Sequence, residues 1–304
     1  MTLFKNRIPT STASGSPLLY PLTNEYLFRA VFQASPKALE GLCRALLRLS
    51  SEDTIQITLQ NPIELGSKTE EKELALHLSV LINNTMSLRL ILQLALDHFC
   101  TEYALLTACR NFEHLYSGNN YETIEPVFHI SFLNYSLFPE YPEFYSSYQL
   151  MNISNPACCC TYSDKLLLSI IDLSQISKAV KEDKDYDIDL WARLLTASTW
   201  RELEVLEQTN DYLQAAVETL RQFMENEIIC QQCHLRENAA HLERLRHKKI
   251  KELDEGLLLT QEELQLAQGE LRQTQGELKL AQDLLRQKEE EVMRLRAELA
   301  TFQQ

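Results

Sequence analysis

The sequence CQQCH, from Cys230 to His234, has the residue types and spacing of a site that could hold a haem or a metal ion. A Cys-x-x-Cys-His pattern is typical of covalent haem attachment, and thiolate and imidazole ligands suit zinc. The surrounding residues are polar and favour a helix, and no second cysteine pair has the spacing of a zinc ribbon. We therefore expect no haem and interpret the motif as helix surface, with zinc as the alternative.

A second candidate lies in LALHLSVLINNTMSLRLILQLA, residues 74–95, which has the pattern of two antiparallel strands joined at Asn83-Asn84. Because side chains alternate along a strand, we expect His77 to share a surface with Ile91 and Gln93, with the leucines on the other face. Neither strand contains an acidic residue. Carboxylates at such positions are what a magnesium-dependent hydrolase would need.

Length and charge set the outer limits. The chain has 304 residues, 45% of them hydrophobic, and a formal net charge of −14. Such an acidic chain is unsuited to broad, non-specific binding of nucleic acid, so any DNA contact would be local. A chain of this length buries a core without disulfides, and we expect its cysteines, including the adjacent Cys158 to Cys160, to be reduced. With no stretch of about 20 apolar residues, we expect a cytoplasmic protein without a membrane span.

The order of elements follows from hydrophobic spacing and from turn residues. Residues 21–49 predict two helices separated at Pro36, and residues 54–60 predict a short strand before the hairpin. Residues 98–117 predict a further helix. Two more strands are expected, in PVFHISFLNYSLF and KLLLSIIDLSQI, and helices follow from about Asp185. Strands clustered between helices predict an α/β domain with a mixed central sheet flanked by helices.

These elements, and several short sequences in them, resemble the PD-(D/E)XK nuclease family transposases, also called recombination-promoting nucleases. The matching sequences lie between about residues 19 and 235 and include LTNEYLFRAVFQ, NPIELG, CRNFEHLYSGNNY, PVFHISFLNYSLFPEYPEFYSSYQLMN and YDIDLWARLLTASTWREL. The resemblance implies a restriction-endonuclease-like core, in which a first helix is followed by a three-stranded meander, a crossing helix and another strand. It also implies a Mg²⁺-dependent DNA endonuclease that promotes recombination.

The family's catalytic positions fall on four residues of this chain. The resemblance implies an acid from the first helix at Glu25, an aspartate at the position of His77, a glutamate at that of Ile91, and a glutamine or lysine at Gln93. Two of the three carboxylates are therefore replaced. Imidazole is a softer ligand than carboxylate, and isoleucine offers none. We expect a catalytically degenerate protein with no bound Mg²⁺.

The alternative is an active enzyme that uses displaced acids. The nearest substitutes are Glu64, Glu73 and Asp97, and Glu25, Glu64 and Glu73 are the weak candidates for metal ligands. Simpler roles also exist, because His77 could fill an abandoned metal pocket, Gln93 could bond neighbouring strands, and Glu25 could stabilise the first turn of its helix through the macrodipole.

Other residues with functional potential have structural interpretations. Trp191, Trp200 and Tyr186 could stack on bases, but we expect them to pack in the core. Arg29 and Arg110 could touch phosphate, but we expect each to lie in solvent or pair with an acid.

The C-terminal part of the sequence contains a heptad repeat, whose positions are Leu257, Leu264, Leu271, Leu278, Leu285, Val292 and Leu299. A strict seven-residue period favours left-handed supercoiling, because a straight helix drifts by about 20° per heptad. If residues 250–304 form one helix, it extends about 80 Å. A stripe that long cannot be buried on one small domain, so we expect self-association, with docking on another protein or a solvated helix as alternatives.

Together these patterns predict four segments: a leader at residues 1–18, a nuclease-like domain at 19–208, a helical extension at 209–249 and a coiled coil at 250–304. They leave two functional hypotheses. The first is a nuclease-family transposase-like protein whose catalysis is lost. The second is a coiled-coil oligomer that acts as an interaction or scaffold protein and binds protein or DNA.

Overall fold

A computed structural model describes residues 15–50, 52–63, 65, 77–93, 100–115, 126–154 and 160–302. Contacts divide the chain into two compact units, residues 1–240 and 241–304, and each is described by itself. The four segment boundaries expected from the sequence remain predictions. No helix in the described part of the chain combines the length and the apolar character that a membrane span requires.

The first unit begins with two helices, α1 (Glu25–Ala34) and α2 (Pro36–Leu46). The side chain of Asn24 caps α1, and the side chain of Ser35 caps α2. Pro36 occupies the first turn of α2, where its missing N–H costs nothing. The two helices predicted on either side of this proline are confirmed.

A six-stranded sheet follows, in the spatial order β1-β2-β3-β4-β6-β5. Its strands are β1 (Ile57–Leu59), β2 (Leu78–Ile82), β3 (Met86–Gln93), β4 (Val127–Leu133), β5 (Tyr145–Tyr148) and β6 (Leu166–Asp172). The first three strands form an antiparallel meander, β3, β4 and β6 are parallel, and β5 is an antiparallel edge. The predicted α/β class with a mixed sheet is confirmed.

The predicted bend of the hairpin is also confirmed. Asn83 and Asn84 join β2 to β3 with φ angles of 52° and 57°. Two successive residues with positive φ form the turn whose twist matches that of paired strands, and asparagine tolerates this conformation better than most residues. The turn fixes the register in which Leu78 pairs with Leu90.

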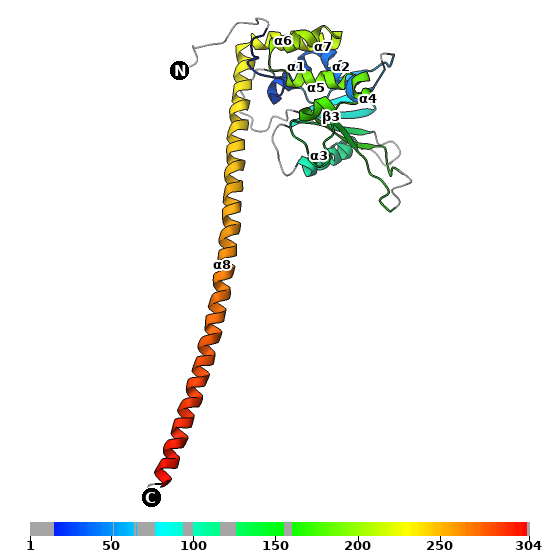
Figure 1. Ribbon diagram of the computed structural model, residues 1–304. Coiled ribbons are helices and arrows are strands. Elements are labelled where there is room, and N and C mark those ends of the chain that lie inside the picture. The colour runs from blue at the N-terminus through cyan, green and yellow to red at the C-terminus, as the bar shows by residue number, and fades with distance from the viewer. Residues whose placement is uncertain are drawn as a thin grey trace. The chain divides into compact units, whose positions relative to one another are not determined.

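Helices cover both faces of the sheet (Figure 1). Helix α3 (Cys100–Leu115) crosses from β3 to β4 on one face, which is the crossing helix that the resemblance implies. Helices α1, α2 and α5 lie on the opposite face. The helices after the sheet are a 3₁₀ helix (Leu173–Lys178), α4 (Lys181–Asp185), α5 (Ile188–Thr196), α6 (Trp200–Glu207) and α7 (Asp211–Met224).

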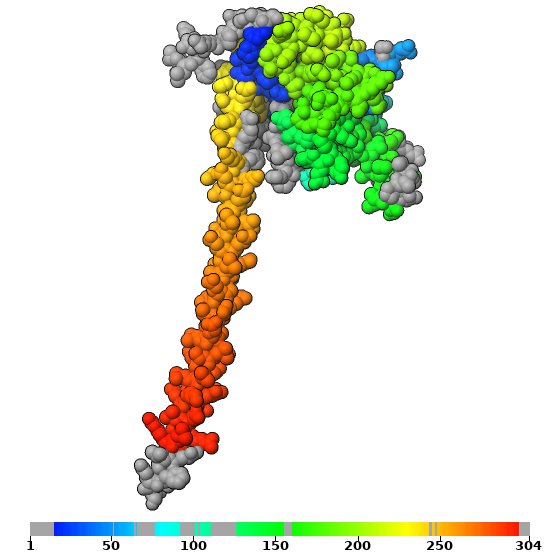
Figure 2. Space-filling model, viewed as in Figure 1, coloured from blue at the N-terminus to red at the C-terminus, as the bar shows by residue number. Residues whose placement is uncertain are grey.

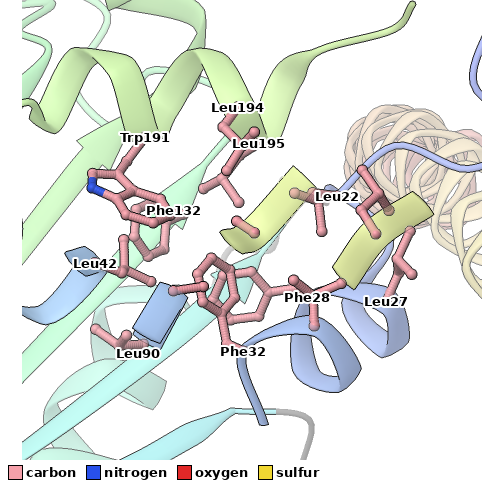
Figure 3. Close-up of a cluster of buried hydrophobic side chains, with 14 of the residues drawn as sticks. Leu22, Leu27, Phe28, Phe32, Leu42, Leu90, Phe132, Trp191, Leu194 and Leu195 are labelled. Atoms are coloured by element: carbon pink, nitrogen blue, oxygen red, sulfur yellow. The ribbon is translucent and has the colours of Figure 1, made fainter. Parts of the chain in front are cut away.

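The main core lies between the sheet and α1, α2 and α5, and aromatic rings occupy its centre (Figure 3). The ring centroid of Phe28 is 4.9 Å from that of Phe32 and 6.1 Å from that of Phe132. Phe32 lies 5.8 Å from Trp191. Each such pair contributes roughly 0.5–1.5 kcal/mol beyond the area that it buries.

The predicted packing roles of the large aromatic residues are confirmed. Trp191 and Trp200 are buried in this core, and Tyr186 packs against it.

The last element, α8 (Glu227–Phe302), begins in the first unit and forms the described part of the second. In its first turns Ile229, Cys230 and Cys233 are buried in the core of the first unit. In the second unit every side chain that is described between residues 248 and 297 is exposed. The side chains of this helix, coloured orange to red, stand out along its length in Figure 2.

Gly41 on α2 provides a test of the packing between helices. A Cβ atom added there would lie 2.9 Å from Cζ2 of Trp191 and closer still to Cβ of Tyr212. We expect Gly41→Ala to destabilise the chain by roughly 1–3 kcal/mol, because this overpacking exceeds the gain in helix propensity. The control is Gly269→Ala, where the added Cβ would have no neighbour within 4 Å. Thermal unfolding of both variants decides the point, and an unchanged melting temperature for Gly41→Ala would contradict it.

Candidate functional site

Arg29 is the centre of a buried polar contact between α1 and the sheet. Its side chain is fully buried, and Nη1 donates to Oδ1 of Asn61 at 3.0 Å and to the backbone oxygen of His77 at 3.1 Å. Its Nη2 donates to the backbone oxygen of Asn61. The expectation that Arg29 could lie in solvent is therefore wrong, and no acid pairs with it among the described residues. Uncharged acceptors from the turn at Asn61 and from His77, which precedes β2, bind the guanidinium.

Asn61 completes this contact and lies in the turn predicted at Asn61-Pro62. Its Nδ2 donates to the backbone oxygen of His77 at 3.0 Å, and its Oδ1 also accepts from the backbone N–H of Ser79 at 3.0 Å. The end of β1 and the start of β2 are thus bonded through one side chain, which fixes where His77 enters the sheet.

Three side chains that carry nitrogen lie on the face of the sheet opposite the main core. Arg89 on β3 pairs with Ser79 on β2 and with His129 on β4, so the side chains of these paired residues share one face. His77 lies two residues before Ser79, so its side chain is on the same face. Leu78 pairs with Leu90, which brings the position of His77 next to that of Ile91. His77, Arg89 and His129 form what we call the nitrogen cluster.

The pKa values within the nitrogen cluster reflect burial and mutual repulsion. Burial, with added repulsion from Arg89 and Arg29, lowers the pKa of His77 from 6.5 to about 4. Burial, Arg89 and His77 lower the pKa of His129 to about 4 in the same way. Burial lowers the pKa of Arg29 to about 10, so it stays charged at neutral pH. At pH 7 the cluster therefore holds two neutral imidazoles beside positive guanidinium groups.

His129 is 1% exposed, and neither of its ring nitrogens has a hydrogen-bond partner among the described residues. A buried polar group without a partner costs roughly 1–3 kcal/mol. The burial of His129 therefore lowers the free energy of unfolding.

The four family positions are placed as follows. Glu25 is the first residue of α1 and is half-buried, in the first turn where an acid was expected to be favourable. His77 directly precedes β2, and Ile91 is half-buried on β3. Gln93 ends β3, and its backbone pairs with Leu133. The displaced acids Glu64, Glu73 and Asp97 lie outside the described residues.

The nitrogen cluster does not fit a hard divalent cation. Mg²⁺ prefers carboxylate and carbonyl oxygens, whereas the described side chains here are imidazole, guanidinium and the hydrocarbon of Ile91. A neighbouring guanidinium also repels a dication. Across the described parts of the chain, no three His, Cys, Asp or Glu side chains are grouped to hold a metal ion.

The Cys230 to His234 motif lies on α8, as the helical interpretation requires, but the interpretation as helix surface is wrong for both cysteines. Cys230 and Cys233 are buried, and burial raises the pKa of both thiols. Oδ1 of Asn24 caps α1, while its Nδ2 donates to the backbone oxygen of Cys233 at 2.9 Å. Nε2 of His234 lies 3.0 Å from Nδ2 of Asn238.

Two further sequence candidates are placed only in part. Arg110 is exposed on α3, as expected. Cys160 is exposed and reduced, while Cys158 and Cys159 lie outside the described residues.

Comparison with known proteins gives one family. The sequence model of the PD-(D/E)XK nuclease family transposase matches residues 22–249, which confirms the resemblance inferred from the sequence. Neither the curated proteins nor the solved structures gave a significant match.

His129 makes the stability of the chain depend on pH. Its pKa is about 4 in the folded chain against an ordinary 6.5, so the unfolded chain takes up a proton first as the pH falls. Stability from this group is complete above pH 6.5 and declines towards pH 4. We expect His129→Leu to reduce the loss of unfolding free energy between pH 7 and pH 5 by about 1–2 kcal/mol.

Urea unfolding of both chains at pH 7 and pH 5 measures the difference. At pH 7 we expect the variant to be as stable as the unmodified chain or more so, because it removes unpaired buried nitrogens. An equal loss in both chains between the two pH values would show that His129 is not buried as a neutral imidazole.

Proposed function

Because the chain belongs to the PD-(D/E)XK nuclease family transposases, we propose that it descends from a metal-dependent DNA endonuclease that promoted recombination and that it no longer cleaves DNA. Hydrolysis of a phosphodiester in such enzymes depends on divalent ions held by carboxylates. Here His77 and Ile91 occupy two of the positions that would supply them.

The observation that carries this proposal is the environment of Arg89. Arg89 pairs with His129 across β3 and β4, and it acts electrostatically on both His129 and His77. The resemblance to the family puts two of the metal-ligand positions, those of His77 and Ile91, at this part of the sheet. The substitutions therefore go beyond the loss of two acids. Positive charge and neutral nitrogen replace negative oxygen, so the local field opposes binding of a dication.

The remaining role that we propose for the first unit is binding without cleavage. The family makes DNA the first partner to consider. Because the net charge is −14, contact with phosphate would have to be local, at surfaces where basic side chains are exposed.

The second candidate function is that of an oligomeric interaction or scaffold protein. It is favoured by the leucine stripe of α8, which is defined by Leu257, Leu264, Leu271, Leu278, Leu285 and Val292. All six side chains are exposed in the single chain, Leu271 by 57%. A long row of exposed leucines at heptad spacing is stabilised when it packs on another helix. The two functions are compatible in one protein.

Loss of cleavage is tested with purified protein, supercoiled plasmid and Mg²⁺ or Mn²⁺. We expect no nicking above the background given by Glu25→Ala, because the described side chains supply no carboxylate set for the ion. Gel analysis of nicked and linear plasmid is the readout. Nicking by the unmodified chain that Glu25→Ala abolishes would mean that displaced acids have rebuilt the site and that the proposal is wrong.

Self-association is tested by sedimentation of the full chain over a range of concentrations. We expect a mass above that of one chain, and a single-chain mass for Leu271→Glu combined with Leu278→Glu, because two charges then enter the stripe. The matched control is Leu266→Glu with Leu280→Glu, since these exposed leucines lie on the opposite side of the helix. Equal effects of the two double variants would contradict assembly through this stripe.

A further inference from the structure

The side chains beside the leucine stripe on α8 determine which orientation of a helix pair is favourable. With the stripe at heptad position a, the d position holds Leu253, Thr260, Ala267, Thr274, Ala281, Lys288 and Leu295. The g and e positions flank this seam, and in a parallel pair each g residue faces the e residue five positions later on the partner helix. The inference drawn from these columns rests on the self-association proposed above.

The polar residues at the seam are satisfied within the single helix. The hydroxyl of Thr260 donates to the backbone oxygen of Gly256 at 2.8 Å, and that of Thr274 donates to the oxygen of Glu270 at 3.0 Å. Their methyl groups can therefore pack against another helix without leaving a hydroxyl unpaired. Nζ of Lys288 lies 2.8 Å from the carboxylate of Glu291, so its charge is compensated on the same helix.

The g and e columns differ in charge. The g column is Lys249, Gly256, Glu263, Glu270, Glu277, Leu284 and Glu291, and the e column is Asp254, Gln261, Gln268, Gln275, Gln282, Glu289 and Arg296. Glutamate thus dominates g, while uncharged glutamine dominates e.

We propose that α8 pairs with α8 of a second copy of this chain in parallel and in register. In that arrangement the two end pairs have opposite charges, Lys249 with Asp254 and Glu291 with Arg296. Between them the three central glutamates face glutamines, whose amides donate to carboxylates. No g–e pair between residues 249 and 296 joins like charges.

The antiparallel arrangement is opposed by the same columns. It places g against g, so the central glutamates Glu263, Glu270 and Glu277 would face glutamates of the partner. Like charges at these positions destabilise a helix pair.

The lysine at one d position bears on the register, and the glycines lie away from the seam. In register, Lys288 faces Lys288 of the partner, and Glu291 on the same helix compensates each charge. A parallel shift of one heptad would instead place each lysine against the apolar Ala281 or Leu295 of the partner, which desolvates the charge without a polar neighbour. Gly269 and Gly276, which weaken a helix, fall at the outermost f position, and no neighbour lies within 4 Å of a Cβ built at either.

The consequence is that both globular units attach at the same end of the paired helices, because each is joined to the N-terminal end of its own α8. A parallel pair would present two copies of the same surface to one partner. Two linked contacts raise the effective concentration of the second, so a weak and local interaction with DNA or protein can become a firm one.

Orientation is tested by adding positive charge to the e column. We expect Gln268→Lys, Gln275→Lys and Gln282→Lys together to tighten the association about tenfold, because each lysine faces a glutamate of the partner only in the parallel pair. The control is Gln265→Lys, Gln273→Lys and Gln287→Lys, which adds the same charge at b and c positions away from the seam. Sedimentation of the full chain gives the dissociation constants.

The possible outcomes separate the two levels of the proposal. Tightening by the e-column lysines beyond the control supports the parallel pair. Weaker association than the control, or equal association, overturns the parallel orientation. In an antiparallel pair the e positions face each other, so the added lysines would repel. A single-chain mass at every concentration overturns the self-association on which the inference rests, and a mass of three or more chains overturns the pair.

Register is tested by disulfide formation under mild oxidation. We expect Val292→Cys to give a cross-linked dimer, because identical a positions meet in a parallel, in-register pair. Ala297→Cys, at the outer f position of the same heptad, is the matched control, and the unmodified chain accounts for its own exposed cysteines Cys109 and Cys160. A non-reducing gel in which Val292→Cys gives no more dimer than the control would overturn the proposed register.

Discussion

The first unit depends on one buried guanidinium. Arg29 and Asn61 together bind α1, the turn after β1 and the residue that precedes β2, and among the described residues no carboxylate takes part in the hydrogen bonds that they form. A buried charge is costly unless its donors find acceptors, so a shift of the backbone at Asn61 or His77 would leave the Nη groups of Arg29 unpaired. That requirement fixes where β2 begins. The start of the hairpin is thus held by one guanidinium and uncharged acceptors.

In the nitrogen cluster the side chains are basic or neutral, whereas a site for a hard dication needs negative oxygen ligands. The imidazole of His129 is buried and that of His77 is half-buried, and Arg89 disfavours protonation of both. Membership of a family defines ancestry and fold, whereas chemistry depends on the side chains at the site. The proposal of a non-cleaving protein follows from this separation, and the exposed stripe on α8 provides a different means by which the chain could act.

Much of the fold could be predicted from local signals. Pro36 marks the break between α1 and α2, and Asn83-Asn84 marks the bend of the hairpin, because both act through the backbone. Strand β5, with the sequence YSSY, was not predicted, since four small or aromatic residues show no hydrophobic alternation. The burial of Cys230 and Cys233 was missed because the stretch is polar on average, while its apolar side chains form one narrow stripe against the core.

The candidate site, too, could be predicted from the sequence only in part. The alternation of β3 places Arg89 on the face of Ile91, and this could be read from the sequence. Its approach to His129 could not, because it depends on the parallel register between β3 and β4, which pairs strands separated by a long crossing segment. The acceptors of Arg29 were equally hidden, since two of them are backbone oxygens and carry no sequence signal.

The short strands at the two margins of the sheet have a consequence of their own. β1 has three residues and β5 has four, so each margin offers few unpaired backbone groups to another chain. Long exposed edge strands pair with strands of neighbouring molecules and lead to aggregation. A protein that self-associates through α8 would bring two such sheets to high local concentration. Short edge strands make it less favourable for the two sheets to pair with each other.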